Sequence, residues 1–150
     1  MATGITEVLD LFLSDEALSA YNAALAEHSL PALSTVRRHR RLLRGIARYP
    51  AAAVEAGEIR GQPEGVGGLR SLRGQVTMHV AFGSADSDQL LTQAPAFVDA
   101  LREAAIGHLS SAFQSLRFAG ARPEGEPFAE RGVALRTVPL SFDFVWLYHD

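Results

Sequence analysis

Strict alternation of apolar and polar residues is the feature that most constrains how this chain can fold. Residues 72–82 alternate in this way, and so do residues 140–148 near the C-terminus. A repeat of two residues is typical of a β-strand that buries one face. Pro139 has no N–H to donate, so we expect it at a bulge or an edge position. The sequence predicts two long strands, whose buried faces carry Leu72, Val76, Met78, Val80, Phe82, Leu140, Phe142, Phe144, Trp146 and Tyr148.

Helical spacing of apolar residues predicts three further regions. Residues 5–28 are expected to form a helix in two pieces, because Ser14 followed by two acidic residues is typical of a helix N-terminus. A further helix is expected over residues 36–49. The longest apolar stripe covers residues 90–116 and predicts a long helix with Pro95 in its first turn.

The order of these elements predicts the fold class. Residues 50–60 are expected to be extended, and the glycines of residues 57–74 indicate a loop or an open hairpin rather than a packed element. We expect an α+β fold, a small and mostly antiparallel sheet packed by one long helix with N-terminal helices added. Residues 1–150 are expected to form a single domain, with a helical lead over 1–48 and a core of sheet and helix over 49–150.

The last predicted strand has apolar residues on both faces. Val145 and Leu147 lie at the positions that alternate with the aromatic side chains. We expect this second face to be covered by the N-terminal helices or by a neighbouring subunit. Val145 and Leu147, together with Trp146, are therefore candidate contact residues.

Composition excludes several classes of site. The chain has no Cys, which excludes disulfides and thiolate chemistry. Its 14 basic residues are all Arg, so it has no lysine for a Schiff base or a phosphate loop. The formal net charge of -3 lacks the basic balance of most nucleic-acid-binding proteins. No apolar run is long enough to span a bilayer and no basic segment opens the chain, so we expect a soluble protein with no secretion signal and no membrane partner.

No catalytic or metal-binding motif is recognisable in the sequence. The five histidines are never three or four residues apart, which is the spacing of two ligands on a helix. The residues around Ser84 lack the second glycine of a nucleophile elbow. We therefore expect no catalytic residue, no metal, no cofactor and no enzymatic activity.

A run of arginines is the one unusual charge feature. Because the guanidinium group pairs bidentately with phosphate or carboxylate, a basic helix face here is a candidate for binding DNA or an acidic protein surface. The alternative is a solvated amphipathic helix with no partner. The candidate interaction residues are Arg37, Arg38, Arg40, Arg41, Arg44 and Arg48.

Four segments in order carry a resemblance to a known family. They are YPAAAVEAG, RGQVTMHVAFGSAD, LLTQAPAFVDALREAAIG and RGVALRTVPLSFDFVWLY. The order and texture of these segments resemble those of the tail terminator proteins of long-tailed bacteriophages, over residues 49–148. The family has no catalytic signature, so no residue role is carried over.

The resemblance implies a structural role in the virion. Members are α+β proteins that form hexameric rings on the last ring of the tail tube, end tube polymerisation and present a surface to the head connector. The implied partners are other copies of the chain, the tail tube protein and a head-tail connector or adaptor, with passive contact to DNA in the lumen. The implied location is the neck of the virion, after assembly in the host cytoplasm.

Two alternatives remain open at this point. The helical lead with its arginines departs from the plainest form of the family, so another head-tail connector or tail-completion protein is one alternative. A small α+β domain that binds a ligand, using His79 or His108 near a junction of helix and sheet, is the other.

Overall fold

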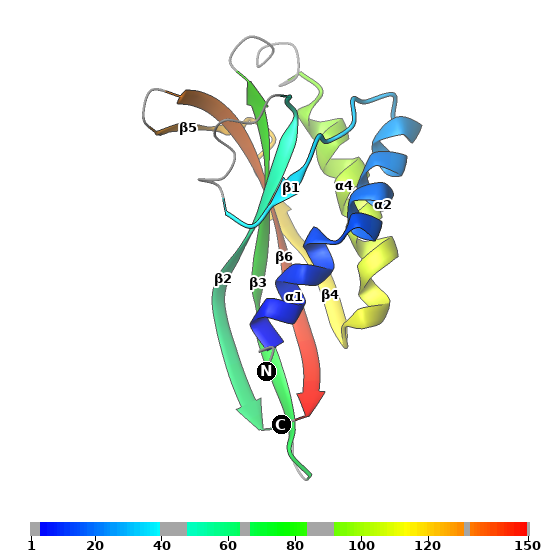
Figure 1. The fold of residues 1–150 in the computed structure, drawn as a ribbon, viewed down its shortest axis with the longest axis vertical. Coiled ribbons are helices and arrows are strands. Elements are labelled where there is room, and N and C mark those ends of the chain that lie inside the picture. Colours follow the sequence, from blue (N-terminus) through cyan, green and yellow to red (C-terminus); the bar gives the residue numbers. More distant parts are fainter. Residues whose placement is uncertain (1–3, 40–47, 64–66, 84–91, 131–132, 150) are drawn as a thin grey trace.

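The computed structural model describes residues 4–39, 48–63, 67–83, 92–130 and 133–149 (Figure 1). In these residues the chain forms helices before and between the strands of one sheet. The elements in order are α1 (Gly4–Leu13), α2 (Asp15–Glu27), β1 (Val36–Arg37), β2 (Ala51–Pro63), β3 (Leu69–Gly83), α4 (Ala94–Leu109), the 3-10 turn η2 (Ser110–Ala112), β4 (Ser115–Ala121), β5 (Glu126–Glu130) and β6 (Val133–His149).

The described strands make one six-stranded sheet, in the order β1-β2-β3-β6-β4, with β5 also paired to β6. The short β1 runs parallel to β2, and the other pairs are antiparallel. The centre of the sheet is the β3–β6 pair, which keeps one register from Leu69 opposite His149 to Gly83 opposite Leu135. The two alternating segments of the sequence are therefore neighbours, and the α+β prediction is confirmed.

The described helices α1, α2 and α4 all pack on the same face of the sheet (Figure 1). The two pieces predicted in residues 5–28 are confirmed, and Ser14 Oγ accepts a hydrogen bond from the N–H of Ala17 over 3.1 Å. The core between the layers is rich in aromatic rings, with Phe12 against Phe142 and Phe113, and Phe82 edge-on to Phe97. Of the two covers expected for the second face of β6, the N-terminal helices are ruled out, because they lie on the same side of the sheet as α4. The other, a neighbouring subunit, stays a prediction.

The predicted helix over residues 36–49 is wrong at its start. Val36 and Arg37 form β1 instead, pairing with Ala52 and Ala53 of β2. A strand forms here instead of a helix because the N–H of Ala52 donates a hydrogen bond to the carbonyl of Thr35 over 3.0 Å and Val36 packs against the core. Residues 40–47 lie outside the described part of the chain.

The long helix is shorter than predicted. α4 has Pro95 in its first turn, as expected, but it ends at Leu109 and the chain enters β4 at Ser115. Phe113 and Leu116 are buried in the observed structure, as a continuing helix would also have buried them. Their apolar character therefore did not distinguish a helix from a strand.

The glycine-rich segment is mostly a hairpin. β2 extends to Pro63 and β3 begins at Leu69, so the hairpin alternative holds, but its arms are packed, with Ser71 and Leu72 buried. β2, β3 and β6 extend past the helical layer at one end (Figure 1). Position 74 requires glycine, because the backbone of β2 lies too close to leave room for a Cβ atom there.

Pro139 lies in β6 where β4 ends and β5 has not begun. Its carbonyl accepts a hydrogen bond from the N–H of Arg122 over 3.1 Å. The nitrogen and the carbonyl of one strand residue point to the same side, so the proline nitrogen, which has no proton, also faces the space between the end of β4 and the start of β5. The β3–β6 register is unbroken there, which rules out a bulge between these strands at this position. The proline instead occupies a local edge inside a central strand.

Candidate functional site

The sheet face opposite α1, α2 and α4 is the candidate site, and we call it the open face (Figure 1). The register of the strands assigns to it the residues that alternate with the core positions. Its charged and polar members include Arg37, Glu55, Glu58, Arg60, Arg73, Gln75, Thr77, His79, Arg117, Arg122, Ser141 and Asp143, and its apolar members include Val145 and Leu147.

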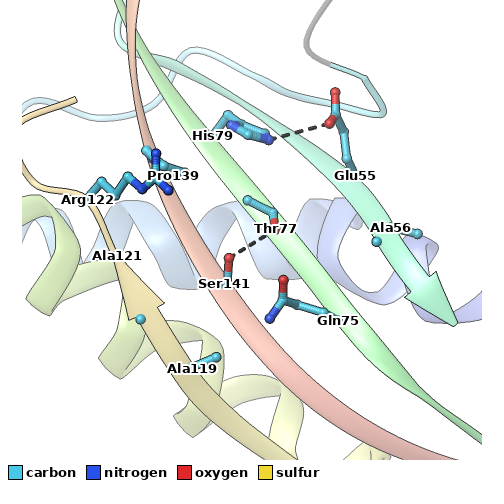
Figure 2. A pocket seen from close by; sticks show the side chains of 12 residues that line it. Glu55, Ala56, Gln75, Thr77, His79, Ala119, Ala121, Arg122, Pro139 and Ser141 are labelled. Atoms are coloured by element: carbon cyan, nitrogen blue, oxygen red, sulfur yellow. Dashed lines mark hydrogen bonds and ion pairs between the residues drawn. The ribbon is translucent and has the colours of Figure 1, made fainter. Parts of the chain in front are cut away.

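A depression of about 540 Å³ lies near the middle of the open face (Figure 2). His79 of β3 and Glu55 of β2 point toward one another there, with Nε2 of His79 3.5 Å from Oε2 of Glu55. The other carboxylate oxygen of Glu55 is 3.5 Å from Nε2 of His39, which follows β1. Thr77 Oγ1 and Ser141 Oγ are 3.1 Å apart on the neighbouring row. Polar groups therefore line the depression, and the carboxylate of Glu55 lies between His79 inside it and His39.

The depression brings hydroxyl, carboxylate and imidazole groups together at one surface. No group of His, Asp or Glu side chains among the described residues is arranged to hold a metal ion. Hydroxyl, carboxylate and imidazole groups at the surface suit hydrogen bonds to a ligand or a protein partner.

A second hollow of about 330 Å³ lies on the open face beside β4. Arg73 and Arg117 line it on either side of Asp143, whose carboxylate accepts a hydrogen bond from Gln75 over 3.2 Å. Arg117 makes no ion pair or hydrogen bond with any described residue. Arg60, opposite Arg73 on β2, forms a hydrogen bond of 3.0 Å with Glu58. This end of the open face is basic.

The six predicted arginines do not share one surface. Arg37 lies on the open face, whereas Arg38 points to the other side of β1 and binds Asp10 of α1 at 2.6 Å. A strand turns successive side chains to opposite faces, which a helix would not have done. Arg48 is exposed beside the turn that precedes β2, and its carbonyl accepts a hydrogen bond from Ser34. The other three, Arg40, Arg41 and Arg44, lie outside the described residues.

The predicted apolar pair does lie on the open face. Leu147 is 38% exposed, one of the two most exposed large apolar side chains among the described residues, and Val145 is half-buried. Trp146 points to the helical side and stacks on Tyr148, with ring centroids 5.8 Å apart. It therefore does not join Val145 and Leu147 in one patch, contrary to the expectation.

The two histidines of the ligand-binding alternative are far from equivalent. His79 is buried on the open face rather than at a junction of helix and sheet. His108 is exposed near the end of α4, beside a hollow of about 630 Å³ that Trp146 and Leu11 also line. The two side chains belong to different surfaces, so they do not form one site.

Residues that sequence reasoning missed are the arginines of β2, β3 and β4. Arg73 lies in a correctly predicted strand, four residues before Thr77. Because side chains alternate along a strand, this spacing could have placed both on the same face. Arg117 follows directly after the helix predicted over residues 90–116 and was given no element, so its place in β4 beside Asp143 was not predicted.

Comparison with protein-family models and with curated proteins found no match for this chain. None of the described helices is long and apolar enough to cross a membrane.

Proposed function

We propose that this chain is a structural protein of the phage neck, a tail terminator that caps the tail tube as a ring. In this role it ends tube polymerisation and offers the surface on which the head is joined. The proposal includes a homohexamer, with the tail tube protein and the head-tail connector as its other partners. It rests on the resemblance over residues 49–148 and on one structural observation, the open face.

The open face supports a ring subunit because a domain of two layers leaves one surface of its sheet free for a partner. A ring needs two different patches on each subunit, one of which meets the other on the next copy. The helical layer and the open face are two such patches on opposite sides of the molecule (Figure 1). The polar depression and exposed Leu147 give the open face the mixed character of a protein contact.

Native mass spectrometry of the purified chain over a wide concentration range, with electron microscopy of any large species, tests the ring. A closed hexamer with a central hole is the expected result. Addition of purified tail tube then tests the capping role, because a terminator binds tube ends and stops their growth. A chain that forms no ring either alone or with tail tube contradicts the proposal.

A ring that binds the connector and leaves tail tube growth unchanged favours the alternative of another head-tail connector or tail-completion protein. The two structural roles share this fold and differ in the surface they recognise. Separate binding assays with tail tube and with connector distinguish them.

The depression around Glu55 and His79 favours one further candidate, a ligand-binding domain. Its volume and its convergent polar groups are those of a small-molecule site. A screen of polar metabolites by thermal shift tests this candidate, with His79→Gln expected to abolish any shift and His108→Gln to preserve it. If the chain stays monomeric and such a ligand raises its melting temperature, the ligand-binding candidate replaces the ring proposal.

A further inference from the structure

The helical layer and the open face carry opposite charge. Helices α1, α2 and α4 contain seven acidic residues, all exposed, and a single arginine. The acidic residues are Glu7, Asp10, Asp15, Glu16, Glu27, Asp99 and Glu103. The arginine, Arg102, lies over the ring of Phe118, with its guanidinium carbon 5.5 Å from the ring centroid. The helical layer is therefore strongly acidic.

The open face is basic. It exposes five arginines, one of which, Arg122, lies beside Pro139 at the rim of the depression (Figure 2). Glu55, Glu58 and Asp143, three carboxylates on the described part of this face, have partners within the sheet. The arginines are Arg37, Arg60, Arg73, Arg117 and Arg122.

Most of the helical carboxylates have no partner within the described chain. Asp10 binds Arg38, and Glu103 lies 3.6 Å from Nε2 of His28. The other five make no ion pair with described residues, and Arg117 on the open face makes none either. Both surfaces thus keep charges that the fold itself does not use.

We propose that the open face of one copy docks on the acidic helical layer of the next copy. The two faces are complementary in charge, whereas sheet against sheet brings arginines together and helices against helices bring carboxylates together. Like charges in contact disfavour both symmetric pairings. The charge pattern therefore selects a head-to-tail contact, the kind that closes into a ring. This inference rests on the proposed ring and names the surfaces that build it.

Charge reversal on each surface tests the contact. The sheet-face variant combines Arg73→Glu with Arg117→Glu, and the helix variant combines Glu27→Arg with Asp99→Arg. Each variant alone sets like charges against each other, and we expect the concentration needed for half assembly to rise about tenfold or more. A 1:1 mixture restores both contacts when the variants alternate, so it is expected to assemble at close to the wild-type concentration.

Glu124→Arg is the matched control, since Glu124 is exposed in the turn between β4 and β5 and its carboxylate makes no ion pair with described residues. Circular dichroism checks that every variant folds. Native mass spectrometry of the mixture counts both variants in each ring, and equal numbers are expected.

The outcomes separate this inference from the proposed function. A wild-type ring that both variants still form, with no gain on mixing, overturns the head-to-tail contact and leaves the terminator role standing. A wild-type chain that stays monomeric at all concentrations and with tail tube overturns both. A monomer whose open face binds duplex DNA, with binding lost only in the sheet-face variant, assigns the arginines to nucleic acid and also overturns the contact.

Discussion

The hydroxyl of Tyr21 completes the C-terminal end of α1 from inside the core. It donates a hydrogen bond of 2.9 Å to the carbonyl oxygen of Phe12, in the last turn of α1. Carbonyls in a last turn have no partner within the helix. We expect Tyr21→Phe to lower the free energy of unfolding by about 1–2 kcal/mol, because a buried carbonyl loses its donor. Urea unfolding measures the loss. Tyr148→Phe is the control, since the ring of Tyr148 is half-buried, and an equal loss in both variants contradicts the role of the bond.

The same side chain predicts a pH dependence. Burial raises the pKa of Tyr21 well above its ordinary value near 10. The folded chain therefore holds this proton at a pH where the unfolded chain releases it, so stability is full below about pH 10 and falls as the pH rises further. Unfolding curves between pH 9 and 11 check the slope. The Tyr21→Phe variant is expected to show a shallower fall than the wild type, and parallel curves would argue against this assignment.

Gly74 sets the geometry of the β2–β3 hairpin. A Cβ atom there would lie 2.6 Å from the carbonyl oxygen of Glu58 and 2.8 Å from Cγ1 of Ile59, where the register of β2 shifts. We expect Gly74→Ala to destabilise the chain by about 1–3 kcal/mol, because backbone atoms must move. Gly107 in α4 has open space around it, so Gly107→Ala is expected to stabilise by about 0.5–1 kcal/mol through helix propensity. Thermal unfolding of the two variants should shift in opposite directions, and shifts of the same sign would refute the account.

Among the elements, those with a clear local sequence pattern were predicted correctly. β3 and β6 were evident because their side chains alternate without interruption, and Ser14 marked the start of α2. β4 was hidden because Phe113 and Leu116 fit a helical stripe as well as a strand, and only pairing with β6 decides between them. β1 was hidden for a related reason, since its two residues become a strand only by pairing with β2. Pairing between distant segments is not encoded in local spacing.

For the whole molecule, the candidate site was predictable only in part. The alternation of side chains along β6 correctly placed Val145 and Leu147 on the face away from the aromatic core residues. The depression was not predictable, because it joins Glu55, Thr77 and Ser141 from three strands whose register only the assembled sheet defines. The opposition of acidic helices and basic sheet was also hidden, since the net charge of -3 averages over both surfaces.

That opposition gives a prediction for two adjacent arginines. Arg37 lies on the open face and Arg38 binds Asp10 on the helical side of β1. We expect Arg37→Gln to weaken assembly several-fold and to flatten its dependence on salt, because a screened attraction between subunits is lost. Arg38→Gln removes an exposed ion pair within one subunit, worth at most about 1 kcal/mol, and leaves the carboxylate of Asp10 unpaired on the acidic helical layer, so it is expected neither to weaken assembly nor to flatten its salt dependence. Sedimentation velocity at low and high ionic strength measures both. Because the two residues are neighbours with the same charge, an equal effect on assembly would show that net charge, rather than the open face, controls the contact between subunits.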